Sequence, residues 1–311
     1  MSAGNRARPG LAEVLSVWIL FGVVALEVWV TYARLPPREL YNVSESGFEG
    51  GAGRALVLLN FPLALVAIAL LAVVADRLRG RLALVALAAA IHCVIVVVPG
   101  VVDQDDLDAK AANALPALGV LIAVVLTGLV LARGGIGASR PFGGGWEVAR
   151  AALAVVILLA SIPWIAAELG FYLSDTPGLR SIFMSGQVRP EPGHPDIRAV
   201  HLGHHHGMDG ALLALSALAL SRVVPQIRGR RLRLALGFYV ALMFVYGLAN
   251  ALQDFWLEQL VKRGTTSLKI PSMIVPTLSW AWLAILGAAL VIQFAAWRVG
   301  SLGKPHEEGV P

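Results

Sequence analysis

The stretch that decides the fold is RALVLLNFPLALVAIALLAVVA, residues 54–75. After the first Arg it contains one strongly polar residue, Asn60, in an otherwise apolar run. A helix needs about 20 apolar residues to cross the hydrocarbon core of a bilayer. The stretch therefore predicts a transmembrane helix.

The rest of the chain repeats this pattern. Hydrophobic residues make up 57% of the 311 residues and charged residues only 14%, against about 45–50% and 25% in soluble domains. This composition excludes a cytosolic enzyme, a disordered tail and a fibrous repeat. We predict an all-α, polytopic integral membrane bundle of about eight transmembrane helices. The predicted spans are 11–33, 54–75, 82–101, 113–132, 148–171, 197–222, 232–255 and 273–298.

The charges predict the orientation of the bundle. The N-terminus, the C-terminus and the three short connections on the same side carry 15 of the 25 Lys and Arg residues and five acids. The four longer connections carry 10 basic and 13 acidic residues. The positive-inside rule then places both termini in the cytoplasm. The predicted location of the protein is the plasma membrane. Most Trp residues fall near span ends, as an aromatic belt predicts.

Four regions follow from this map. They are a four-helix half at 1–133, a Gly-rich cytoplasmic linker at 134–147, a second four-helix half at 148–302 and a disordered tail at 303–311. The polar residues of the two halves do not correspond, which does not favour an inverted-repeat transporter. The basic run IRGRRLR at 227–233 is interpreted as a topogenic loop and not as a nucleic-acid site. The single cysteine, Cys93, excludes an intramolecular disulfide.

Five of the seven His residues gather in PGHPDIRAVHLGHHHGMDG, residues 192–210. The apolar run that follows is too short to span a bilayer, so we expect its helix to start near Asp196, a suitable N-cap. On such a helix His201, His205 and Asp209 are spaced i, i+4, i+8 and share one face.

Imidazole and carboxylate side chains are ligands for transition metals, so this face predicts a site for divalent Zn, Fe or Cu. His201, His205 and Asp209 are the predicted ligands. His204 lies within the same arc as a further ligand or proton shuttle, whereas His206 points elsewhere. Two other interpretations stay open, a proton-handling polar site and a solvated cluster at the membrane interface.

Further polar residues are predicted at the same depth in other spans. Glu27, Asn60, Glu168, Asn250 and Asp254 all fall in the outer halves of their spans. Charged groups inside a membrane usually face a bundle interior or a water-filled cavity. Their shared depth predicts a site that opens to the extracytoplasmic side.

Three functions remain in competition. The first is a metal-dependent hydrolase or oxidoreductase acting on a lipid-like substrate, with Glu168 as general base and His204 assisting. The second is a transporter or binding protein for a metal ion or small solute. The third is a haem or quinone redox protein, which would require His92 to face a member of the His cluster. The bilayer is the one partner that the sequence itself implies.

Overall fold

The computed structural model describes residues 10–34, 47–102, 109–137, 144–168, 206–261, 264–274 and 276–298. Within these ranges the chain is all-α, apart from an isolated bridge between Gly10 and Gly137. The described residues form eight α-helices, six of which are long and apolar enough to be candidate membrane spans, against about eight transmembrane helices predicted. The eight helices are α1 (Leu11–Arg34), α2 (Gly47–Ala75), α3 (Arg81–Val94), α4 (Ala114–Ala132), α5 (Gly145–Glu168), α7 (His206–Ser221), α8 (Arg230–Phe255) and α9 (Trp280–Arg298).

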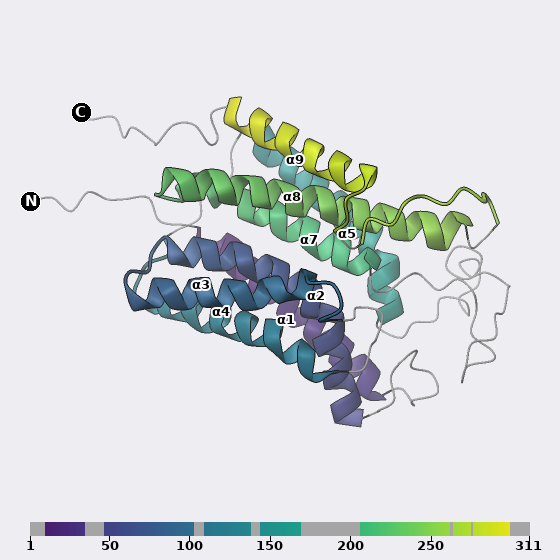
Figure 1. Ribbon diagram of the computed structural model, residues 1–311, viewed down its shortest axis with the longest axis horizontal. Helices are drawn as coiled ribbons and strands as arrows, with labels where there is room; N and C mark the ends of the chain where they lie inside the picture. Colours follow the sequence, from purple (N-terminus) through teal and green to yellow (C-terminus); the bar gives the residue numbers. More distant parts are fainter. Residues whose placement is uncertain are drawn as a thin grey trace, which may run out of the picture.

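The helices lie side by side along the long axis of the molecule (Figure 1). The first four form the lower tier of the view and α5 with α7 to α9 the upper tier. Helix α2 packs against α1, α3 and α4 in its own tier and against α7 and α8 in the other. Most of its side chains are buried, because it has neighbours on nearly every side. The stretch that predicted the fold is therefore the central helix of the bundle.

The outer surface of the bundle is apolar, as a bilayer requires. On α1, an exposed stripe spaced by three or four residues contains Ile19, Val23, Leu26 and Val30. Six helices are long and apolar enough to cross a membrane by length and composition. Helix α3 with its short 3₁₀ extension, and the described part of α7, are shorter. The chain is thus a multi-pass membrane protein by the composition of its helices.

Four helix ends differ from the predicted spans by more than three residues. Helix α3 ends at Val94 and its 3₁₀ extension at Val97, before the predicted end at 101. Helix α2 starts at Gly47, seven residues early, because the Gly-rich turn packs tightly on α1. A Cβ at Gly51 would lie 2.4 Å from the Trp29 carbonyl oxygen. Helix α8 continues as a π-helix, Trp256–Val261, into the predicted loop. Helix α9 starts at Trp280, seven residues late, where Ser279 accepts the Trp282 N–H as an N-cap.

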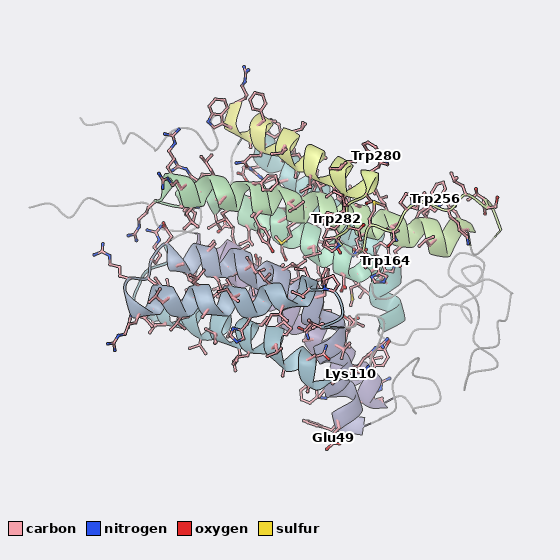
Figure 2. All side chains as sticks on the ribbon, viewed as in Figure 1. Glu49, Lys110, Trp164, Trp256, Trp280 and Trp282 are labelled. Atoms are coloured by element: carbon pink, nitrogen blue, oxygen red, sulfur yellow. The ribbon has the colours of Figure 1, made fainter. Side chains whose placement is uncertain are left out.

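We call the end of the bundle that holds the first residue of α1 and the last of α9 the inner end, and the opposite end the outer end, after the predicted orientation. Four labelled Trp residues lie toward the outer end, on the right of Figure 2, together with Glu49 and Lys110. They are Trp164, Trp256, Trp280 and Trp282. This placement agrees with an aromatic belt, although Trp164 is buried against α7.

Ion pairs tie the helices together at the inner end. Arg222, just after α7, donates to Glu13 of α1 at 2.7 Å and also to Glu147 of α5. Glu147 pairs in addition with Arg150 at 2.9 Å. We call Glu13, Glu147, Arg150 and Arg222 the inner clasp. It joins three helices that are far apart in the sequence.

A second contact at this end joins α2 to the turn between α7 and α8. Asp76 accepts hydrogen bonds from the backbone N–H groups of Arg228 and Gly229, at 3.1 and 3.3 Å. Arg77 donates to the Gln226 carbonyl oxygen at 3.2 Å. The three acids of the inner end that the structure describes, Glu13, Asp76 and Glu147, are therefore all paired.

Candidate functional site

The structure describes Asp209 but not the predicted His ligands of the metal site. His201, His204 and His205 lie outside the described residues, as do the first nine residues of the predicted helix 197–222. Asp209 lies in the first turn of α7 and is 5% exposed. Glu168 is the last residue of α5, and its side chain is outside the described part.

Helices α7 and α8 touch backbone to backbone directly beside Asp209. A Cβ at Gly210 would lie 2.4 Å from the Gly247 carbonyl oxygen, and a Cβ at Gly247 would lie 2.6 Å from that of Gly210. Such contacts require glycine at both positions, because no other residue lets two helix backbones come this close. The crossing holds Asp209 against the outer half of α8, where Tyr246 lies within electrostatic range of its carboxyl group.

Tyr246 is the aromatic centre of this region. Its ring lies 6.1 Å from that of Phe61 on α2 and 5.3 Å from that of Trp282 on α9. Its hydroxyl group donates to the Ile274 carbonyl oxygen at 2.6 Å. One side chain thereby links α8 to α2, to α9 and to the connection that precedes α9.

The polar side chains that follow along α8 are all buried. Asn250, Gln253 and Asp254 are 1%, 2% and 6% exposed. Gln253 has a structural role, because its side-chain oxygen accepts the Met273 N–H at 2.6 Å. The Asn250 Oδ1 atom is buried and has no hydrogen-bond partner. Asp209, Asn250 and Asp254 thus supply carboxylate and amide oxygens at one end of the α7–α8 pair.

The other two supporting residues lie on other helices. The Asn60 amide of α2 donates to the Asn113 carbonyl oxygen at 3.0 Å, just before α4. This hydrogen bond gives the amide group a structural role, whereas the Asn60 Oδ1 atom is buried without a hydrogen-bond partner. Glu27 on α1 is partly buried, and its Oε1 atom is enclosed without a hydrogen-bond partner. Polar residues at the predicted depth therefore occur on α1 and α2 as well as on α7 and α8.

The haem hypothesis gains no support from the placement of His92. Helix α3 packs on α2 and α4. The His92 Nδ1–H donates to the Ala88 carbonyl oxygen of its own helix at 2.8 Å. No observation on the described residues pairs His92 with α7, which a bis-His haem would need.

Sequence reasoning missed one residue at the outer end, Arg54. The charge map counts it among the flanks of the outer connections, yet it lies inside α2 and is 1% exposed. The glycines that precede it, GFEGGAG at 47–53, are the signal that could have found it. Small residues at helical spacing indicate a helix that continues in close contact with a neighbour.

Neither the grouping of side chains nor the comparisons with known proteins identifies a ligand. In the part of the chain that the structure describes, His, Cys, Asp and Glu side chains do not form a group of three or more suited to a metal ion. Three of the four residues that the sequence places there lie outside that part. No protein-family model, no curated protein and no solved structure matches the chain.

Proposed function

We propose that this membrane protein binds a divalent transition metal, Zn, Fe or Cu, in a His/carboxylate site at the outer end of the α7–α8 pair. The observation that carries the proposal is the burial of Asp209 directly after the His cluster, where α7 touches α8, together with the burial of Asn250 and Asp254 on α8. In this proposal His201, His205 and Asp209 are the ligands. Imidazole with carboxylate is a common donor set for these ions.

The energetics of burial favour an ion at this position. Carboxylates inside a membrane are costly unless they are paired or coordinated. Asp209 and Asp254 bring two of them to neighbouring helices whose backbones are in contact. A cation that accepts several ligands at once would coordinate both, and the preceding imidazoles would complete its coordination.

The chemistry that we propose for the site is metal-dependent catalysis on a lipid-like substrate. A bound ion of this class would act as a Lewis acid toward an ester, amide or phosphodiester. Glu168 at the end of α5 would serve as general base, and His204 as ligand or proton shuttle. An oxidative reaction is compatible with the same donor set.

A transporter or capture protein for a metal ion or small solute is the second candidate, and the inner end favours it. The inner clasp closes the cytoplasmic end with paired charges, while the polar groups of the outer end are buried near its surface. A carrier that is closed at its inner end, with its binding groups enclosed near the outer end, has this arrangement. Transport predicts uptake of the ion into vesicles, which an enzyme would not show.

The metal content of the purified protein tests the proposal. We expect a stoichiometric ion in the wild type and a loss of at least tenfold in affinity with Asp209→Asn or His205→Ala, because each removes one ligand. Matched controls are His206→Ala, next to the site but off its face, and Asp76→Asn, a buried Asp at the inner end. Wild-type protein without metal, or equal content in all variants, contradicts the proposal.

A further inference from the structure

Arg54 is a buried cation at the outer end whose hydrogen-bonding capacity is largely unused. Its Nη2 group donates to the Tyr32 hydroxyl group at 3.3 Å, and its guanidinium carbon lies 4.6 Å from the centre of the Tyr32 ring. The Nε and Nη1 groups are enclosed and have no hydrogen-bond partner. They hold three of the five N–H donors of the side chain.

The charge of Arg54 is not balanced by a carboxylate. No ion pair among the described residues involves Arg54, and the nearest acid on its own helix, Glu49, is exposed. Arg222 at the inner end shows the contrast, because it is less buried and has two carboxylate partners. An arginine stays protonated in any protein environment, so burial cannot remove this charge.

The position of Arg54 places it beside the seam between the two tiers. Arg54, Phe61 and Leu65 share one face of α2, since they are separated by seven and four residues. On that face Phe61 contacts Tyr246, and the Leu65 carbonyl oxygen accepts the Tyr239 hydroxyl group at 2.8 Å. Arg54 lies two turns, about 10 Å, nearer the outer end. It therefore lies at the headgroup side of the seam.

We propose that Arg54, steadied by Tyr32, binds a phosphate group at the outer end of α2. An oxyanion would supply the missing negative charge, and its several oxygen atoms would accept the donors that are unused. The planar guanidinium group suits phosphate in geometry as well as in charge. This site does not depend on the proposed metal.

Two sources could present the phosphate, a phospholipid headgroup or free inorganic phosphate. The test measures the Tm of detergent-solubilised protein by Trp fluorescence with sodium phosphate, with short-chain phosphatidylglycerol and with the matching diacylglycerol, which lacks the phosphate. We expect a rise of roughly 5 °C in the wild type at saturating ligand. A rise with the lipid alone identifies the headgroup, and a rise with phosphate alone identifies the free ion. Diacylglycerol should have no effect.

Variants separate a ligand-binding arginine from a structural one. Without ligand, Arg54→Met should be at least as stable as the wild type, because it replaces an uncompensated buried charge by an apolar chain of similar length. It should show no rise with either phosphate source. Arg233→Met is the matched control: Arg233 is also buried, but it lies at the inner end and donates to the Ile227 carbonyl oxygen at 3.3 Å. The Arg233 Nε atom also lacks a partner, so this variant removes a comparable buried charge and should keep the ligand-dependent rise.

The outcomes are decisive even if Arg54→Met does not fold. Arg54→Lys keeps the charge and loses the planar fork, so it should bind at least tenfold more weakly than the wild type. Wild-type affinity in Arg54→Lys, an unchanged rise in Arg54→Met, or no rise in the wild type with either source overturns the proposal. Metal content measured on the same samples keeps this result separate from that of the metal site, because Arg54 variants should retain the ion.

Discussion

The two ends of the bundle treat buried carboxylates in different ways, although the inner end also holds a buried arginine, Arg233, whose Nε atom has no hydrogen-bond partner. At the inner end Glu13, Asp76 and Glu147 each pair with an arginine. At the outer end Arg54 and the Glu27 Oε1 atom are enclosed without such partners, and Asn250 keeps a buried oxygen that accepts nothing. Buried polar groups are costly unless they are satisfied. The inner end is thus organised for stability, and the outer end retains groups whose cost a ligand would offset.

Breaking the inner clasp should give the largest effect. Arg222→Met would leave the Glu13 carboxylate, 7% exposed, without its guanidinium partner, whereas Glu147 would keep Arg150. Removing one partner of a buried pair costs about 3 kcal/mol. We expect that loss in the free energy of unfolding, measured by denaturation in SDS with circular dichroism.

The double variant Arg222→Met with Glu13→Gln sharpens this expectation. Neutralising the Glu13 carboxylate should restore at least half of the lost stability, because no negative charge is then buried at the position that Arg222 had faced. Metal content and phosphate response should not change in either variant. A clasp variant that unfolds no more easily than the wild type would show that the inner end does not hold the helices together.

Separating α7 from α8 should give an intermediate effect and reach the outer end directly. A methyl group at Gly210 would lie 2.4 Å from the Gly247 carbonyl oxygen, so Gly210→Ala must push the helices apart. Overpacking of this kind costs about 2 kcal/mol. Because Asp209 is the adjacent residue, the same variant should also weaken metal binding.

A glycine in open surroundings provides the control for this variant. Gly128 on α4 has no atom within 4 Å of an added Cβ, so Gly128→Ala should be neutral or stabilising by about 0.5 kcal/mol. Equal effects of the two substitutions on unfolding would mean that helix propensity, and not the backbone contact at Gly210, sets the stability.

The fold was predictable from the sequence to the extent that apolar length determines it. Hydropathy located eight helices, because each long apolar run needs either a bilayer or a deep core. It misplaced the start of α2 because GFEGGAG is not apolar, and close contact with α1 extends the helix instead. It misplaced the start of α9 because hydropathy cannot weigh the cap provided by Ser279.

The candidate site was predictable only along single helices. Periodicity within α8 sets Asn250 above Asp254, and this relation needs no tertiary structure. Which neighbour a side chain meets does need it. Asn60 turns to the start of α4, and Arg54 is buried among helices instead of lying in an outer loop. The roles of His201, His204, His205 and Glu168 stay predictions.

The smallest expected effect distinguishes two buried amides at the outer end. Asn60→Leu removes the hydrogen bond to the Asn113 carbonyl oxygen. That oxygen then lacks its donor, at a cost of about 1 kcal/mol in stability. Asn250→Leu removes an amide whose Oδ1, like that of Asn60, has no hydrogen-bond partner, and among the described residues no hydrogen bond to a backbone carbonyl like that of Asn60 is lost. Its stability in the absence of metal should therefore equal or slightly exceed that of the wild type.

Metal affinity reverses the order, because Asn250 lies beside Asp209 and Asp254, whereas Asn60 faces α4. Paired measurements of unfolding and metal content on these two variants, at equal protein concentration, test whether the outer end keeps its unused oxygen for a ligand. If Asn250→Leu is the less stable of the two and binds metal normally, Asn250 is a structural residue and the contrast between the two ends of the bundle is weaker than the hydrogen bonds indicate.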